Sequence, residues 1–169
     1  MHDDSSNLDV LIDIDDDRWL EWYTPDQWHV LLHKIIQRVI ENIKIQTKVE
    51  VSILLTNNDE IHALNLEYRG KDKPTNVLSF SSLSEEELRF LPKSHPYPIM
   101  LGDLVFAFET LLEEVKIEKK PFLDHFNHLV VHGMLHLLGH DHESDDDEEC
   151  MKEKEIMILR SLNVNNPYQ

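Results

Sequence analysis

The chain has 169 residues, 41% hydrophobic and 29% charged, a composition typical of a soluble globular protein and not of a disordered one. We expect a single domain over residues 1–169. A net charge of −17 excludes binding to nucleic acid through an overall positive field. A polyanionic ligand would therefore need a local basic patch or a metal ion.

Targeting signals and cysteine usage narrow the expected location. No apolar run approaches the ~20 residues needed to span a bilayer. The acidic N-terminus argues against a secretory signal and against an Arg-rich transit peptide. Cys150 is the single cysteine, which excludes an internal disulfide and a thiolate zinc site. The expected location is a reducing cytosol.

The first 70 residues predict two strands, each followed by a helix. Residues 8–14 and 49–55 have strand character, the second with alternating apolar positions. Thr24 and Gln27 form a capping-box pattern. Behind them, apolar residues recur at helical spacing: Trp28, Leu31, Leu32, Ile35, Ile36, Val39, Ile40 and Ile43. Another helix is expected after Asn57, and Gly70 is placed to end it.

The second part of the chain predicts two more strands and three more helices. A surface loop or lid is expected over residues 81–100, which contain three prolines. The expected elements are strands at 76–80 and 101–106, a helix at 108–115, a long helix opened by Pro121, and a last helix from about Ser144. Without a regular strand–helix–strand repeat, these elements predict an α+β domain with one small mixed sheet.

The segment HGMLHLLGHDH, residues 132–142, has the spacing of a metal site. His132 and His136 are four residues apart, so both imidazoles lie on one face of a helix. Gly139 predicts the end of that helix, after which His142 can turn back as a third ligand. Three neutral imidazoles leave a fourth position open for water, which is typical of a catalytic zinc. We therefore predict one Zn²⁺ per chain.

Other residues around this motif leave alternatives open. We interpret His128 as a packed or supporting residue and not as a ligand. His140 continues the four-residue spacing from His136, but the expected end of the helix favours His142 as the third ligand. Asp141 either orients an imidazole or is a turn residue. The alternative that these histidines are ordinary polar or core residues is disfavoured by the combined spacing of three histidines and a glycine.

The residue after the first histidine distinguishes this motif from that of a protease. Metzincin proteases share the spacing but place a glutamate there, which acts as the general base. In this chain the position is Gly133. A protease would thus keep its metal ligands and lose its proton acceptor.

A second informative segment, NLEYRGKDKPTNVLSF, covers residues 65–80. Arg69, Lys71 and Lys73 place three positive charges within five residues of an otherwise acidic chain. For the two lysines, a solvated turn is an equally good interpretation. An arginine at a helix end can instead clamp a phosphate through two hydrogen bonds. Arg69 is therefore a candidate for contact with a polyanion.

At these two segments the sequence resembles the YbeY family of endoribonucleases, which is associated with bacterial ribosomal RNA maturation. The family's HGxLHLxGxDH matches residues 132–142, its YRxxDxPTDVLSF resembles residues 68–80, and its GD-plus-strand element resembles residues 102–105. Asn76 stands where the family usually has Asp, which argues against a role for negative charge at that position.

The resemblance implies a zincin-like α+β fold in which helices flank a small mixed sheet, with the metal site on a long helix and the turn after it. It implies a zinc-dependent hydrolase that cuts single-stranded RNA in small-subunit ribosomal RNA processing and ribosome quality control. Proteins of the small ribosomal subunit are further candidate partners. The family's metal ligands correspond to His132, His136 and His142, and its active-site arginine corresponds to Arg69.

The expected chemistry leaves two points open. Zinc would activate a water or polarise the scissile phosphate, with His132 and Arg69 as catalytic residues and Arg69 neutralising the developing charge. The alternative to attack by a water is attack by the RNA's own 2′-hydroxyl.

A function of another class is a ribosome-associated assembly factor whose metal site is structural or weakly active. Cleavage of single-stranded RNA by the zinc-loaded protein, and its loss in Arg69→Ala, would distinguish the two functions.

Overall fold

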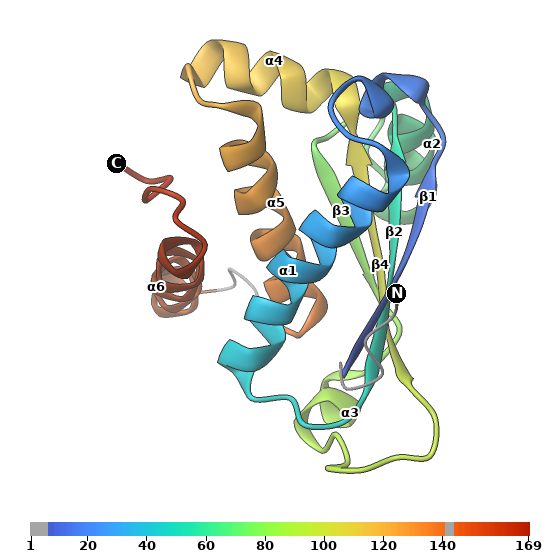
Figure 1. Ribbon diagram of the computed structural model, residues 1–169, viewed down its shortest axis with the longest axis vertical. Coiled ribbons are helices and arrows are strands. Elements are labelled where there is room, and N and C mark those ends of the chain that lie inside the picture. Colours follow the sequence, from blue (N-terminus) through green and yellow to red (C-terminus); the bar gives the residue numbers. More distant parts are fainter. Residues whose placement is uncertain (1–6, 141–143) are drawn as a thin grey trace.

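The computed structural model describes residues 7–140 and 144–169, and within them four strands form one mixed sheet (Figure 1). The order is β1-β2-β4-β3, where β1, β2 and β4 are parallel and β3 is antiparallel to β4. The strands are β1 (Leu8–Ile14), β2 (Val49–Thr56), β3 (Val77–Ser81) and β4 (Ile99–Ala107). The predicted α+β fold with a small mixed sheet is confirmed.

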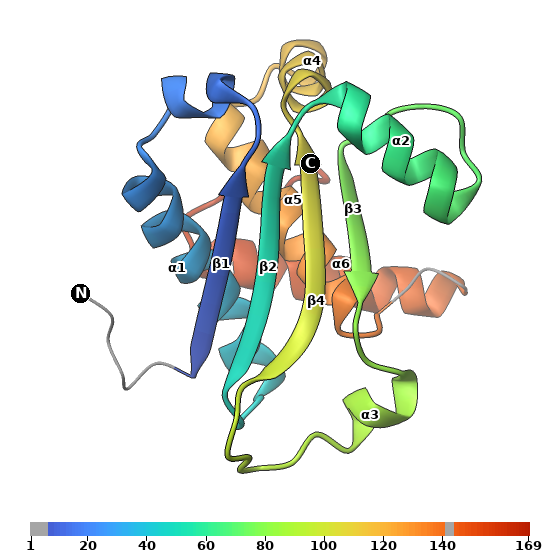
Figure 2. The same ribbon diagram turned by 90° about the vertical axis from the view of Figure 1, so that its right-hand side faces the viewer.

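Helices cover the sheet in layers. The described elements are a 3-10 turn at Asp17–Glu21, α1 (Pro25–Ile43), α2 (Asn58–Arg69), α3 (Glu85–Arg89), α4 (Phe108–Glu118), α5 (Phe122–Leu137) and α6 (Asp145–Ser161). Figures 1 and 2 show α1 and α5 against one face, with α6 outside α5. None of the helices in the described ranges is long and apolar enough to cross a bilayer.

The main core lies between the sheet and the pair α1 and α5. Alternating residues of β2 are buried there, as their period-two pattern predicts: Val49, Val51, Ile53 and Leu55. On the other face, Ile61 of α2 packs with Leu78, Val105 and Ala107 in a smaller cluster. The sheet is therefore packed on both faces near the start of β3.

Local sequence signals explain most element boundaries. Thr24 and Gln27 make both hydrogen bonds of the predicted capping box at the start of α1. Gly70 ends α2 at φ 67°, a conformation that glycine adopts without strain. The expected loop at 81–100 is partly wrong, because Ser84 and Glu87 form a capping box that starts the short helix α3.

The turn at Asp17–Glu21 is an element that the sequence pattern did not indicate. Trp19 from this turn is fully buried, and its indole N–H donates a hydrogen bond of 2.8 Å to the Thr56 carbonyl at the end of β2. The Trp28 indole in turn donates to the Trp19 carbonyl at 2.9 Å. Two tryptophans thus close one end of the core.

Candidate metal centre

Helix α5 brings two of the predicted ligands together. The Nε2 atoms of His132 and His136 lie 3.1 Å apart, as expected for histidines one helical turn apart. The helix ends at Leu137, and Gly139 follows with φ 95°, so the chain turns where the sequence predicted. The third predicted ligand, His142, lies outside the described residues.

A buried carboxylate from α6 contacts the first of these histidines on its other side. Glu155 is 0% exposed, and its Oε1 lies 2.5 Å from Nδ1 of His132. Its Oε2 accepts a hydrogen bond from the Tyr168 hydroxyl and lies 3.4 Å from Nε2 of His128. Donor atoms of His128, His132 and Glu155 all lie within 4.8 Å of one another, so this group could bind a metal ion.

The sequence interpretation missed Glu155, although a signal for it exists. Six acidic residues surround it in α6, and most of them face solvent. Glu155 instead shares the buried face of the helix with Met151, Ile158 and Leu159, at the spacing of one helical stripe. A carboxylate within an apolar stripe needs a buried partner, and that requirement points to a histidine nearby.

Hydrogen bonds keep Glu155 ionised despite its burial. Burial by itself raises the pKa of this carboxyl, but the hydrogen bonds from His128, His132 and Tyr168 outweigh it and hold the pKa at about 2. Burial and the neighbouring carboxylate both raise the pKa of Tyr168, which therefore stays a hydrogen-bond donor. His132 consequently faces a permanent negative charge at its Nδ1 side.

Distances indicate which side of His132 suits a metal ion. Two nitrogen ligands ~2.0–2.1 Å from a tetrahedral zinc lie about 3.3 Å apart. The 3.1 Å between the Nε2 atoms of His132 and His136 is close to that separation. The 2.5 Å between His132 Nδ1 and Glu155 is a hydrogen-bond distance, too short for two ligands of one ion. The donor set therefore fits a metal on the Nε2 side.

Arg69 lines the same pocket as these histidines. The end of α2 carries it to β3, where its guanidinium donates a hydrogen bond of 2.7 Å to the Ser79 carbonyl. A pocket of about 410 Å³ is lined by Arg69, Asn76, Val77, Leu78, Ser79, Ser81, His132, His136 and Leu137. Lys71 and Lys73 are exposed and do not line it. The structure thus brings Arg69, His132 and His136 into one hollow.

Asn76 at the edge of this pocket pairs with a carboxylate. Its amide nitrogen lies 3.2 Å from each oxygen of Glu114, whose Oε1 is also 3.0 Å from Nε2 of the buried His125. Burial raises the pKa of Glu114, but the hydrogen bonds from His125 and Asn76 give a net lowering. The amide of Asn76 therefore supplies the hydrogen-bond donor that the negatively charged Glu114 carboxylate needs.

Gly133 is where α5 approaches the sheet closely. A Cβ at this position would lie 3.1 Å from Cδ2 of Leu104 and 3.4 Å from Oγ of Ser79. The Ser79 hydroxyl donates a hydrogen bond of 3.1 Å to the Gly133 carbonyl. The position taken by the base of a metzincin is thus a packing contact between α5 and β3 in this protein.

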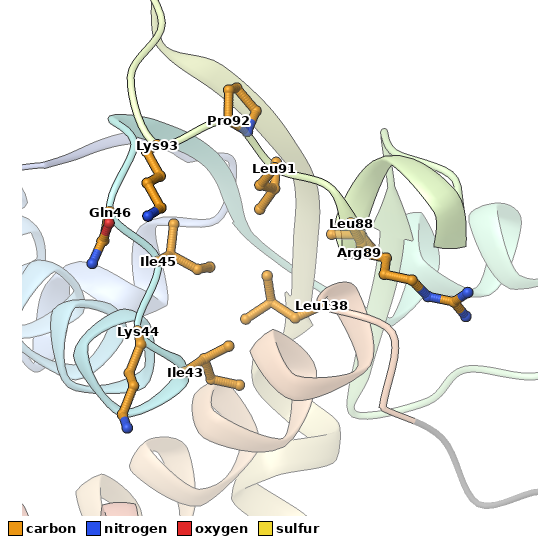
Figure 3. Close-up of a pocket in the computed structure, with 10 residues that line it drawn as sticks. All are labelled: Ile43, Lys44, Ile45, Gln46, Leu88, Arg89, Leu91, Pro92, Lys93 and Leu138. Carbon is orange, nitrogen blue, oxygen red and sulfur yellow. The ribbon is translucent and has the colours of Figure 1, made fainter.

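A second hollow lies beside the turn that follows α5. It has a volume of about 360 Å³ and is lined by residues 43–46, 88, 89 and 91–93 and by Leu138 (Figure 3). Ile45 and Leu138 face into it, whereas Arg89 points away. Among the residues that the structure describes, this lining includes no histidine or carboxylate, the groups that a metal site needs.

The fold and the pocket define an α+β protein with a histidine-rich candidate metal centre. Residues 13–163 match the family model described as endoribonuclease YbeY. The chain belongs to this family of endoribonucleases, which confirms the predicted resemblance and the predicted class of enzyme.

Curated relatives and a solved structure agree with the family match. The chain is 49% identical over 139 residues to the endoribonuclease YbeY of Acinetobacter baumannii, covering 82% of this chain and 85% of that protein. It is 46% identical over 120 residues to that of Paramagnetospirillum magneticum, covering 71% of each. The solution structure of TM1509 from Thermotoga maritima has a TM-score of 0.54 at 24% identity over 91% of both chains, a likeness in fold.

Proposed function

We propose that this protein is a zinc-dependent endoribonuclease that cuts single-stranded RNA during the maturation of small-subunit ribosomal RNA and in ribosome quality control. The observation that carries the proposal is the pocket that Arg69, His132 and His136 line together. A cation and a pair of histidines facing one hollow suit a phosphodiester. The endoribonuclease names of relatives at 46–49% identity support the reaction class.

The proposed metal ligands are His132, His136 and His142, with one zinc per chain. The Nε2 separation of 3.1 Å in the first pair supports two of them, and the turn at Gly139 is compatible with the third. Bound there, zinc would supply a Lewis acid for the scissile phosphate and for the attacking water. Besides being a proposed ligand, His132 is with Arg69 one of the two proposed catalytic residues.

Arg69 would bind a phosphate oxygen and neutralise negative charge as it develops in the transition state. Its hydrogen bond to the Ser79 carbonyl and its position 5.0 Å from the centre of the Phe80 ring hold the guanidinium in place. The remaining N–H groups of the planar fork are then preorganised for a phosphate. Such local recognition suits a protein whose net charge of −17 repels RNA overall.

The proposal also covers the domain organisation and the biological setting. We infer one hydrolase domain over residues 1–169, because β1 pairs with β2 and α6 packs on α5, which ties both ends of the described chain to one core. Ribosomal RNA is the proposed substrate, proteins of the small ribosomal subunit are candidate partners, and the cytoplasm is the proposed location. These assignments follow from the resemblance to the family.

The test uses RNA cleavage by the purified full chain. A labelled single-stranded RNA and the same sequence as a duplex are incubated with zinc-loaded protein, with and without a chelator. We expect cleavage of the single strand alone, its loss on chelation, and no cleavage by His136→Ala. Cleavage that survives both chelation and His136→Ala would overturn the metal-dependent mechanism. An intact single strand would favour the assembly factor.

A further inference from the structure

The C-terminal segment reaches back to the candidate metal centre. Tyr168 lies 13 residues after Glu155, and its hydroxyl donates to Glu155 Oε2. We propose that Glu155 and Tyr168 are positioning residues that hold the His132 ring in the one tautomer whose Nε2 can bind a metal. The inference rests on the proposed metal-dependent function and goes beyond it, because it assigns a role to two residues outside the histidine motif.

The tautomer follows from hydrogen-bond chemistry. A neutral imidazole carries one N–H, and the partner of one nitrogen decides which nitrogen that is. An ionised carboxylate only accepts hydrogen bonds, so Glu155 Oε1, 2.5 Å from His132 Nδ1, requires the proton on Nδ1. The lone pair is then on Nε2, the atom that faces Nε2 of His136. Carboxylates that accept from the second nitrogen of a histidine ligand both orient its ring and raise its basicity.

Tyr168 acts on His132 through Glu155. A carboxylate with two oxygens could rotate, but Oε2 is held by the Tyr168 hydroxyl and by the weaker contact with His128. The tyrosine ring is itself held, edge-on to His128 at 5.5 Å and beneath the Lys152 ammonium at 5.2 Å. Lys120 also donates to the Pro167 carbonyl at 3.2 Å, which ties the segment next to Tyr168 to the residues just before α5. These contacts therefore hold the ring, and with it the hydroxyl that donates to Glu155.

The experiment compares Glu155→Gln and Tyr168→Phe with wild type and with Tyr97→Phe. The glutamine variant keeps the shape of the side chain and removes its charge, and the phenylalanine variant at position 168 removes only the hydroxyl. Tyr97 is 73% exposed and makes its contacts with His95, which is not part of this cluster, so its variant is the matched control. Zinc affinity is measured by competition with a chelator. The His132 tautomer is read from long-range ¹H–¹⁵N correlations on the metal-free full chain, and thermal midpoints are measured in chelator.

We expect zinc affinity to fall about 10–100-fold in Glu155→Gln and roughly fivefold in Tyr168→Phe, with no change in Tyr97→Phe. In metal-free wild type the His132 proton should be on Nδ1, and Glu155→Gln should shift it towards Nε2. Wild-type affinity together with an unchanged tautomer in both variants would overturn the inference. The inference would also be overturned if zinc affinity fell in proportion to the thermal midpoint while the His132 tautomer stayed unchanged.

Two complications are covered by the same measurements. If Glu155→Gln does not fold, Tyr168→Phe decides the case, because it keeps the ring and its packing. If the wild type binds no zinc, the proposed metal-dependent function fails. The tautomer of the metal-free protein still tests the positioning role, since that readout needs no metal.

Discussion

The Arg69 guanidinium donates a hydrogen bond of 2.7 Å to the Ser79 carbonyl, joining the last residue of α2 to the middle of β3. Ser79 in turn donates through its hydroxyl to the Gly133 carbonyl of α5. One strand residue therefore contacts both the arginine and the helix that carries the histidines. In each of these hydrogen bonds a side chain donates to a backbone carbonyl, so β3 links the end of α2 to α5 beside the pocket.

The first prediction is that Arg69→Ala lowers RNA cleavage and leaves the fold intact. Removing a charge contact made in the transition state should reduce turnover by about 10²–10³-fold. Arg69 is exposed, so the thermal midpoint and the zinc content should stay close to wild type. Arg69→Lys should recover only part of the activity, because a point charge lacks the bidentate fork. Single-turnover cleavage and melting curves on both variants provide the measurement.

Lys71→Ala is the control for this prediction, since it removes a nearby exposed charge that does not line the pocket. Its cleavage rate should stay within a few-fold of wild type, by the weakness of a single screened charge. Equal losses in Lys71→Ala and Arg69→Ala would assign the effect to general charge. A lowered midpoint in Arg69→Ala with full activity on cooling would show that the arginine serves the fold alone.

The second prediction concerns metal content and the identity of the third ligand. Elemental analysis of the wild type should find close to one zinc per chain, and His136→Ala should lose most of it, because two of the expected ligands face each other at 3.1 Å. His142→Ala should lose more zinc than His140→Ala. The reverse order would identify His140 as the third ligand.

The third prediction is that the zinc-loaded protein does not hydrolyse peptides. Gly133 supplies no base, and Gly133→Glu should not create one, since even a Cβ meets Leu104 at 3.1 Å. Overpacking at this contact should destabilise the variant by about 1–3 kcal/mol. A peptide-release assay and thermal melts measure the two effects. Chelator-sensitive proteolysis by clean wild-type protein would contradict the assignment.

Periodicity and capping signals predicted most of the fold, because those signals are local. The Thr24 capping box, the turn at Gly70 and the alternation in β2 each follow from residues within a few positions of one another. The short turn around Trp19 was missed because its stability comes from a distant partner, the Thr56 carbonyl. Pairing order in the sheet likewise depends on contacts that no local pattern encodes.

In the candidate site, too, residues with a local sequence signal were predicted and a residue placed by tertiary packing was not. The spacing of His132, His136 and Gly139 is a local signal, and the structure brings the two histidines together as that spacing indicates. Glu155 contacts His132 from 23 residues away, a relationship set by how α6 packs on α5. Within α6 the many neighbouring acidic residues obscured its place in the apolar stripe, and its burial in the structure makes that place evident.

The fourth prediction concerns Asp16 and stability in acid. Asp16 accepts hydrogen bonds from the backbone and side chain of Arg18, and these hold the pKa of its carboxyl well below the usual range. A lowered folded-state pKa gives stability that is present above the unfolded pKa of ~3.9 and is lost as pH falls below it. Asp16→Asn should therefore cost about 1–2 kcal/mol at pH 7, after allowance for the partly exposed arginine.

Denaturant unfolding at pH 7 and at pH 3 measures this effect. The difference between wild type and Asp16→Asn should shrink at the lower pH, because the Asp16 carboxyl group of the unfolded chain then takes up a proton while that of the folded protein stays ionised. Asp17→Asn is the matched control, since no side-chain hydrogen bond of Asp17 is seen within the described residues, and its cost should be near zero at both values. A pH-independent difference for Asp16→Asn would argue against an ionic contribution.

The last prediction concerns Asn76, which donates its amide to both oxygens of Glu114 at 3.2 Å. Asn76→Asp would place a second carboxylate against the first, and like charges at this distance raise the pKa of the pair. A raised folded-state pKa favours folding at low pH and costs stability as pH rises through it, so the variant should lose about 1–3 kcal/mol at pH 8 and less at pH 5. Adding Glu114→Gln restores a donor opposite the new carboxylate and should recover most of the loss at pH 8. Unfolding curves on wild type, the two single variants and the double variant make up the double-mutant cycle that measures this interaction. Equal losses at both pH values, or a double variant no more stable than Asn76→Asp, would show that charge matching does not decide the residue at position 76.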